Sequence, residues 1–417
     1  MRGMSPASPF HAPAAARRAL ADGALAALAG VLAGTGGAGF LLALDAVTAA
    51  RFAQPWLLAL LPLAGLISAW AYRRAGGPSG RGHNLIIEEI HTPGGGVPLR
   101  MAPLVTGASL LTHLCGGSAG REGTGVQMGG ALAGGLARAV GLDGERRSTL
   151  LSAGVAGGFG AIFGTPLAGA VFAREVLVRG RLSHHGLGAC LVAALTGDLV
   201  CTAWGAHHAD LATLARLGEW TTDGLAAPLA QSALVGLAAG LVARLFVAAA
   251  RAVTRALEKI APAWWLKPIL GGLAVGGLAL ALGTDVYLGL GAAHPDPAAP
   301  SLLTLFSPGG AAPADWLWKL VFTAVTIGAG FKGGEVTPLF FIGAALGHVL
   351  GPLAGLPIAP AAALGFVAVF AGASKTPLAC TLLGVELFGG EHAALFGVAC
   401  LTAFLAGGRD GIYEAQR

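Results

Sequence analysis

Residues 116–130 read Gly-Gly-Ser-Ala-Gly-Arg-Glu-Gly-Thr-Gly-Val-Gln-Met-Gly-Gly and separate two long apolar segments. The ionisable pair Arg121-Glu122 at its centre is costly inside a bilayer, so its presence there indicates a functional site. Glycines on both sides leave the backbone free to bend and to expose its N–H groups. The stretch therefore predicts a small-anion site with a titratable carboxylate beside it, in a chain whose membrane helices are interrupted.

Composition places the chain in a membrane. Only 11% of the 417 residues are charged and 55% are hydrophobic, and the mean hydropathy is +0.71. A soluble protein of this length needs far more charge on its surface. The 68 glycines suit close helix packing in lipid. The net charge of +5 comes with no basic cluster interleaved with aromatics, so no nucleic-acid partner is expected.

Charges near the N-terminus predict the orientation. The positive-inside rule favours a cytoplasmic N-terminal segment, residues 1–19, followed by a hairpin of the first two apolar segments. We expect a multi-pass protein of the cell membrane, which in a bacterium is the inner membrane, without a cleaved signal peptide. The five cysteines lie in or beside apolar runs without a C-x-x-C pair, which argues against a disulfide framework. The basic residues on which the predicted orientation rests are Arg2, Arg17, Arg18, Arg73, Arg74 and Arg81.

The apolar segments are uneven in length. Several are too long for one span of about 20 residues and contain glycine or proline, and others are short. This pattern is typical of broken and re-entrant helices rather than of a regular bundle. Proline-rich 291–315 and histidine-containing 205–222 are predicted loops. The segments lie at 20–50, 53–72, 98–115, 124–141, 148–178, 186–204, 224–250, 267–290, 314–331, 335–353, 357–388 and 392–407.

An internal repeat connects these segments. Thr-Pro-Leu-Ala occurs at 165–168 and again at 376–379, and each copy has a glutamate nine residues after its proline, Glu175 and Glu386. Upstream, Glu122-Gly123-Thr124 resembles Glu335-Val336-Thr337, at matched distances of 43 and 41 residues from the Thr-Pro pair. We therefore expect two halves, about 80–205 and 224–417, and a transporter that binds its substrate at their interface near mid-membrane.

The glycine-rich turns predict anion chemistry. Helices that begin near Thr124 and Pro338 would direct unpaired N–H groups and positive dipole ends toward one point. Ordinary re-entrant turns capped by hydroxyls are the alternative, and the repeat favours the anion interpretation. Glu122 could compete with the anion when charged and carry a proton when neutral. A plain ion pair with Arg121 is the alternative role, although adjacent residues on a helix do not face each other.

Other ionisable residues carry weaker signals. Glu335 could be neutralised by the nearby Lys332, and Glu175 and Glu386 are interpreted as interfacial residues at the ends of apolar runs. Asn84 is a reasonable helix cap. The pairs His184-His185 and His207-His208 lack metal-ligand spacing. With no Walker loop, nucleophile elbow or H-E-x-x-H, neither an enzyme, a metal site nor a cofactor is expected.

Four motifs together resemble the CLC chloride channel and transporter family, from about residue 20 to the C-terminus. They are 117–124 (Gly-Ser-Ala-Gly-Arg-Glu-Gly-Thr), 333–338 (Gly-Gly-Glu-Val-Thr-Pro), the doubled Thr-Pro-Leu-Ala and the final 411–413 (Gly-Ile-Tyr). The resemblance implies an all-α polytopic domain over 20–417, built as an inverted repeat with broken and re-entrant helices. It also implies a homodimer in which each subunit has its own anion pathway.

The resemblance also implies residue roles. Glu122 would be the external gating glutamate and proton carrier. The anion-binding residues would lie in the first loop, around the gate, in the third motif and at the central tyrosine. These are Gly82, His83, Asn84, Gly120, Arg121, Gly123, Thr124, Glu335, Val336, Thr337 and Tyr413.

The chain departs from the usual chloride pattern in ways that look like the family's fluoride/proton antiporter branch. Thr124 stands where G-R-E-G-P has proline, His83 replaces a chloride-coordinating serine, and Val336 replaces phenylalanine. The internal proton-relay glutamate falls on Val176, with Glu175 one residue early. Replacing the water shell of small, strongly hydrated fluoride requires more and stronger donors than chloride needs, which Thr124, Thr337 and His83 could add.

A proton-coupled fluoride exporter is therefore the leading hypothesis, with fluoride, protons and membrane lipid as partners. A chloride channel or chloride/proton antiporter is the runner-up. An intramembrane hydrolase with a His/Glu pair is a different class, but the histidines lack catalytic spacing and no serine or cysteine nucleophile context is evident. A transport-dead sensory relative is a third possibility.

Overall fold

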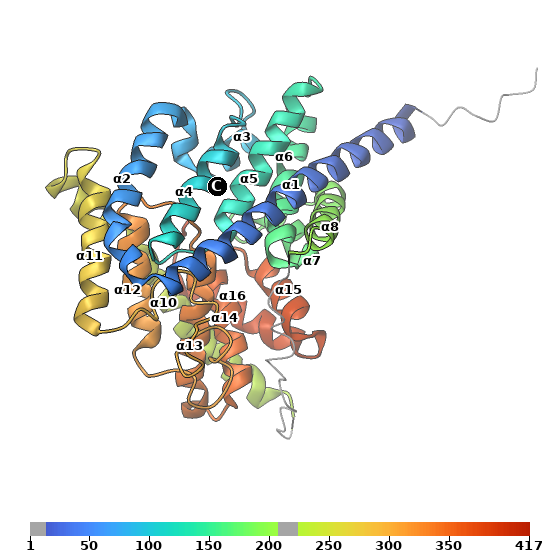
Figure 1. Cartoon of the computed structure of the whole chain (residues 1–417). Helices are drawn as coiled ribbons and strands as arrows, with labels where there is room; N and C mark the ends of the chain where they lie inside the picture. The colour runs from blue at the N-terminus through green and yellow to red at the C-terminus, as the bar shows by residue number, and fades with distance from the viewer. Residues whose placement is uncertain (1–13, 207–223) are drawn as a thin grey trace, which may run out of the picture.

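The N-terminal part of the chain is a series of helices of very different lengths (Figure 1). The computed structural model describes residues 14–206 and 224–417, and within them no strand is formed. Short 3-10 turns and one π turn occur at Pro55–Leu60, Tyr72–Gly76 and Gly77–Arg81. The helices of this part are α1 (Ala14–Ala53), α2 (Leu61–Ala71), α3 (His83–His91), α4 (Met101–Leu114), α5 (Glu122–Ala139), α6 (Gly144–Phe163), α7 (Pro166–Glu175) and α8 (Leu187–Ala203).

The C-terminal part contains the remaining helices and a long irregular segment, 283–314. Its helices are α10 (Ala226–Ile260), α11 (Leu266–Leu282), α12 (Asp315–Gly328), α13 (Val336–Leu353), α14 (Ile358–Ser374), α15 (Pro377–Phe388) and α16 (Ala393–Ala406), with a 3-10 turn at Gly390–His392. The loop expected at 291–315 is confirmed up to the start of α12 at Asp315. The loop expected at 205–222 falls almost entirely outside the described residues.

Helix packing in the two parts follows one order. Long α1 lies along α6 and α8, and long α10 lies along α14 and α16. Likewise α5 packs on α6 as α13 packs on α14, and α4 meets α5 as α12 meets α13. Helix α1 begins at Ala14, inside the segment expected to be a cytoplasmic tail, and its neighbours correspond in chain order to those of α10.

Two of the longest apolar runs, 148–178 and 357–388, are broken in the same way. Helix α6 ends at left-handed Gly164 and α14 ends at left-handed Lys375, whose φ angles are 70° and 62°. Thr165 and Thr376 follow, and Pro166 and Pro377 begin the next helix, because proline suits the first helical position. Lysine is strained in this conformation, which glycine adopts freely. The expectation of interrupted segments at 148–178 and 357–388 is confirmed.

Glu175 and Glu386 join the two parts reciprocally. The Glu175 carboxylate accepts hydrogen bonds from the N–H groups of Leu378 and Ala379, at 3.0 and 2.8 Å. The Glu386 carboxylate accepts them from Leu167 and Ala168, at 2.9 and 2.8 Å. Each glutamate thus caps the first turn of the helix that bears the other. The interpretation of both as interfacial residues did not include these contacts, which join segments more than 200 residues apart in sequence.

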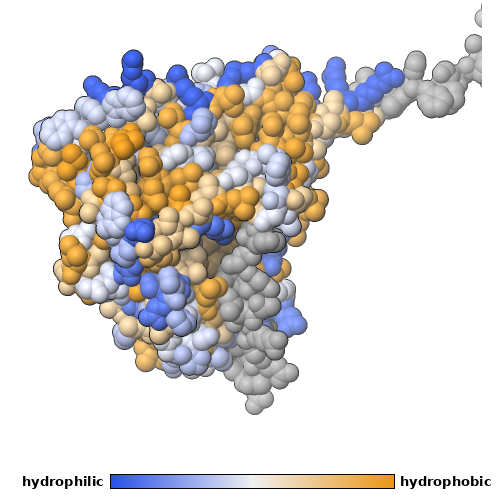
Figure 2. Space-filling view, viewed as in Figure 1, coloured by the Kyte–Doolittle hydropathy of each residue, from blue (hydrophilic) through white to orange (hydrophobic). Residues whose placement is uncertain are grey.

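The surface and the helix lengths suit a bilayer. In the described part of the chain, four helical stretches are long and apolar enough to cross one: Ala16–Ala53, Pro55–Arg81, Ala226–Ile260 and Val336–Leu353. Figure 2 shows hydrophobic side chains over much of the visible face and hydrophilic ones along its upper edge. The first two segments do not form a packed hairpin as expected, since α2 packs on α4 and α11 while α1 packs on α5, α6 and α8.

Candidate functional site

Glycines allow the two parts to cross at the centre of the molecule. Gly120 and Gly334 exchange backbone hydrogen bonds, N–H to O, at 2.5 and 2.7 Å. A side chain at Gly123 would put its Cβ 3.0 Å from both the Gly334 Cα and the His83 Cε1. Three elements therefore meet at one point where a larger residue does not fit. The two glycine-rich motifs of the sequence are brought together here.

Glu122 begins α5 and places its carboxylate on the first turn of α13. Its Oε2 accepts hydrogen bonds from the Arg121 and Thr337 N–H groups, both at 3.1 Å. Its Oε1 accepts one from the Thr337 hydroxyl, at 2.5 Å. Both helices begin two residues earlier than expected near Thr124 and Pro338. That earlier start puts Glu122 and Thr337 in the facing first turns, where the dipoles favour negative charge.

Arg121 approaches Glu122 more closely than expected. Its Nε lies 3.6 Å from the Glu122 Oε1, an ion pair without a side-chain hydrogen bond. Arg121 is the residue before α5 rather than a residue of that helix, so the rule that adjacent helical side chains do not face each other does not exclude this pair. The ion pair and the contact with Thr337 coexist.

His83 and Tyr413 lie on the other side of Gly123 and line one small cavity of about 10 Å³. Their ring centroids are 5.2 Å apart. The His83 Nδ1 lies 3.3 Å from the Gln127 Nε2, and its Nε2 is buried without a hydrogen-bond partner. Gly82 is the residue before α3 and has a positive φ of 56°. These positions place His83 and Tyr413 next to the contact between Gly123 and Gly334.

Asn84 and Thr124 have partners that the sequence did not indicate. The Asn84 Oδ1 accepts a hydrogen bond from the Ala415 N–H at 3.1 Å, so the expectation that Asn84 caps α3 is wrong. It instead ties the C-terminal segment, which carries Tyr413, to α3. The Thr124 hydroxyl lies 2.6 Å from the Ser109 hydroxyl of α4 and is fully buried, so it joins two helices.

Glu335 is the residue before α13 and lies within electrostatic range of Glu122. Its Oε2 is buried without a hydrogen-bond partner, and the group interacts electrostatically with both Lys332 and Glu122. The Lys332 ammonium lies 4.6 Å from the centroid of the Tyr72 ring, and no ion pair between it and Glu335 forms among the described residues. Val336 is buried in the first turn of α13. Glu335 is thus a second carboxyl group close to Glu122.

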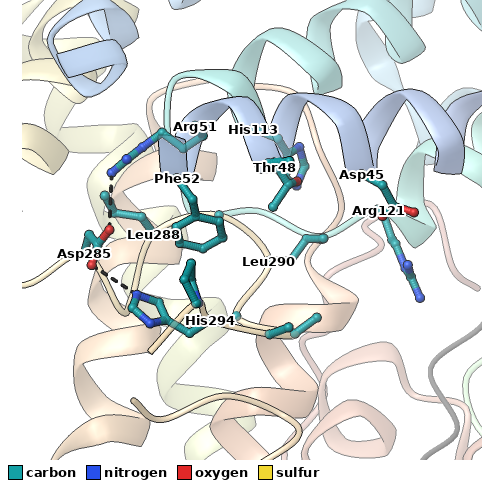
Figure 3. A pocket seen from close by; sticks show the side chains of 16 residues that line it. Asp45, Thr48, Arg51, Phe52, His113, Arg121, Asp285, Leu288, Leu290 and His294 are labelled. Carbon is teal, nitrogen blue, oxygen red and sulfur yellow. Dashed lines mark hydrogen bonds and ion pairs between the residues drawn. The ribbon is translucent and has the colours of Figure 1, made fainter. Parts of the chain in front are cut away.

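Two cavities share Arg121 beside Glu122, and the larger of them reaches the end of α1. A cavity of about 50 Å³ is lined by Arg121, Glu122, Thr337 and the rings of Phe163, Phe340 and Phe366. A larger one of about 470 Å³ shares Arg121 and lies between α1 and the segment that carries Asp285 and His294 (Figure 3). Arg51 is 3.9 Å from Asp285 there. The small cavity has room for roughly one or two waters, so an ion in it sheds most of its shell.

The comparisons with known proteins agree with this architecture. A family model described as voltage gated chloride channel matches residues 64–408. The chain belongs to the CLC family of chloride channels and transporters.

Two relatives of this CLC protein are particularly similar. A protein of Pseudomonas syringae pv. tomato named "Chloride/fluoride channel protein" is 46% identical over 400 residues, covering 94% of this chain and 86% of that one. The crystal structure of a CLC-type fluoride/proton antiporter matches with a TM-score of 0.88 at 34% identity, over 98% of this chain and all of that one.

A cyanobacterial Cl⁻/H⁺ antiporter matches with a TM-score of 0.74 at 21% identity, covering 93% of this chain and 94% of that one, and it supports the fold alone. The expected all-α CLC architecture is confirmed. This CLC protein is an anion transporter of a family of channels and transporters rather than of enzymes.

Sequence reasoning missed several residues of the site. Ser109 contacts Thr124, and Gln127, which lies within the glycine-rich stretch 116–130, contacts His83. The phenylalanines of the small cavity were also missed, because aromatic residues in apolar helices are ordinary packing residues. Their meeting in one cavity depends on packing between helices, for which the sequence carries no local pattern.

Proposed function

We propose that this CLC protein exports fluoride in exchange for protons, with Glu122 as gate and proton carrier. The observation that carries the proposal is the position of the Glu122 carboxylate. Its two oxygens accept hydrogen bonds from the Arg121 N–H just before α5 and from the N–H and hydroxyl of Thr337 in the first turn of α13. A small anion that enters this point needs the same donors. The carboxylate and the anion therefore compete for one place.

Protonation would release the gate. A neutral carboxyl group is a weaker acceptor and gains less from the dipoles of α5 and α13 than a carboxylate does. Once protonated, Glu122 leaves its donors to the anion, and the proton then moves with the side chain. Deprotonation returns the carboxylate to Thr337 and expels the anion. Anion and proton movements in opposite directions follow from this competition.

Fluoride is favoured over chloride by the donor set and by the relatives. Fluoride needs strong donors to replace its water shell, and Thr337 offers an N–H and a hydroxyl at one residue. The cavity of about 50 Å³ beside them forces dehydration. The "Chloride/fluoride channel protein" and the fluoride/proton antiporter among the relatives support the same anion. With its hydroxyl against Ser109, Thr124 adds less to this case than Thr337.

The assembly and location are part of the proposal. We place the chain in the cell membrane, the inner membrane of a bacterium, with the start of α1 and the end of α10 on the cytoplasmic side. There it forms a homodimer with one pathway in each subunit. The family supports both statements, and the gate residues Glu122, Thr337, His83 and Tyr413 all come from one chain.

An anion-flux comparison in proteoliposomes tests the proposal. Vesicles loaded with equal concentrations of fluoride or chloride should release fluoride at least about tenfold faster, which corresponds to about 1.4 kcal/mol between the two barriers. Equal rates would refute the fluoride assignment and favour the chloride channel or chloride/proton antiporter. Vesicles without protein give the lowest efflux rate, and vesicles with a leak ionophore give the highest.

A further inference from the structure

A basic cavity lies at the cytoplasmic end of α10, away from the gate. It has a volume of about 360 Å³ and is formed by one face of α10 and the segment that follows α16. The residues that line it are Arg244, Val247, Ala248, Arg251, Arg255, Gly407, Gly408, Arg409 and Asp410. The anion pathway does not use any of them, so the cavity needs a separate explanation.

The cavity holds more positive charge than its carboxylates neutralise. Arg251 is paired with Asp410 at 3.3 Å and with Glu414 at 3.7 Å, and it also donates to the Gly411 carbonyl at 3.1 Å. Within the described part of the chain, Arg244, Arg255 and Arg409 have no carboxylate at ion-pair distance. Three guanidinium groups around one hollow therefore remain available to an anion from outside.

A second cavity on the same side of the membrane gives a useful contrast. It has a volume of about 290 Å³ and lies between α1, α6 and the start of α8. Its Arg146 is paired with Asp22 at 2.6 Å, and its His185 with Glu145 at 3.2 Å. Each basic group there has its own carboxylate, so a cytoplasmic cavity of this fold does not require surplus charge.

An apolar stripe on α10 leads to the basic cavity. Leu234, Leu237, Leu241 and Leu245 are spaced by three or four residues and are each between 44% and 60% exposed. Residues at this spacing lie on one face of a helix. The 35 residues of α10 extend over about 52 Å, well beyond the hydrocarbon core of about 30 Å. The leucines therefore face lipid tails, and Arg244, Arg251 and Arg255 reach the headgroup level.

We propose that this cavity binds the phosphate of an anionic phospholipid of the cytoplasmic leaflet. The guanidinium groups of Arg244, Arg255 and Arg409 hold the phosphate oxygens, a pairing that arginine favours by its fork of donors. The acyl chains lie along the leucine stripe of α10. Anionic lipid is selected over a zwitterionic one because the latter brings its own cation into the basic cavity. A free phosphate lacks the apolar contact.

Lipid retention on the purified full-length protein tests this proposal. The protein is equilibrated with equal amounts of phosphatidylglycerol and phosphatidylcholine of identical chains, and bound lipid is counted by native mass spectrometry. We expect phosphatidylglycerol to exceed phosphatidylcholine about fivefold or more. The triple variant R244Q/R255Q/R409Q should reduce this ratio to about one. Asp410→Asn, which removes a competing carboxylate, should raise the ratio. Arg74→Gln, on the same membrane side, is the matched control and should leave it unchanged.

Three results would overturn the proposal. The first is a ratio of one in the wild-type protein, a measurement that does not depend on any variant's folding. The second is a ratio that persists in a triple variant that elutes as the wild type does on gel filtration. The third is loss of the bound phosphatidylglycerol when excess inorganic phosphate is added, which would make the cavity a simple oxyanion site.

Discussion

At the scale of single residues, Thr337 has the most direct effect on the gate. Its N–H and hydroxyl both donate to the Glu122 carboxylate, across 215 positions of sequence. Thr337→Val removes the hydroxyl donor, and a hydrogen bond to a charged group contributes about 1.5–3 kcal/mol. In this variant the unprotonated carboxylate should leave Thr337 more often. Anions would then pass without a proton, so the number of protons moved per anion should fall.

Proteoliposome measurements of proton and fluoride flux check this prediction. Thr337→Ser keeps the hydroxyl and is the matched control, so it should keep the wild-type ratio. A Thr337→Val variant with unchanged coupling would show that the hydroxyl has no part in holding the gate.

The sequence identified Glu122 and the third motif but not their contact. Glycines around the ionisable pair Arg121-Glu122 indicate an anion site. The spacing of the repeat predicts a corresponding glycine-rich motif at 333–338. Which side chain fills which first turn depends on packing between elements far apart in sequence. For that reason the partners of Asn84 and Thr124, namely the Ala415 N–H and Ser109, could not be predicted.

At the scale of helices, α7 and α15 depend on each other through Glu175 and Glu386. A glutamine in place of either glutamate leaves one backbone N–H of the opposite helix without its acceptor, at a cost of about 1–3 kcal/mol when buried. Glu175 is fully buried and Glu386 is only partly so. We expect Glu175→Gln to lower the midpoint of thermal unfolding more than Glu386→Gln does.

Thermal unfolding of the two variants in the same detergent provides the measurement. The proton-to-fluoride ratio should stay at the wild-type value in both, since these carboxylates act as helix caps. A change in that ratio in Glu175→Gln alone would instead assign Glu175 to the proton route. The internal repeat predicted that Glu175 and Glu386 occupy corresponding positions. Their capping contacts could not be predicted, because they join segments far apart in sequence and leave no local pattern.

At the scale of the whole molecule, all the residues of the proposed gate come from one chain. Glu122 on α5, Thr337 on α13, His83 on α3 and Tyr413 after α16 meet within one subunit. In the proposed homodimer the two pathways should therefore work independently. Mixing wild-type subunits with an inactive variant such as Gly123→Trp, whose side chain fills the crossing, should lower fluoride efflux in linear proportion to the wild-type fraction. A quadratic dependence would mean that both subunits must be intact.

In the proposed mechanism the Glu122 carboxylate couples the anion to the proton, and the pH of the medium during fluoride efflux reports this coupling. Vesicles that contain the reconstituted protein are loaded with fluoride and placed in fluoride-free buffer, and the pH of the medium is followed. Fluoride efflux through the wild-type protein should drive protons into the vesicles, so the medium becomes alkaline. Glu122→Gln cannot exchange a proton and should show no such change. Proton uptake that persists in a folded Glu122→Gln protein would contradict the account.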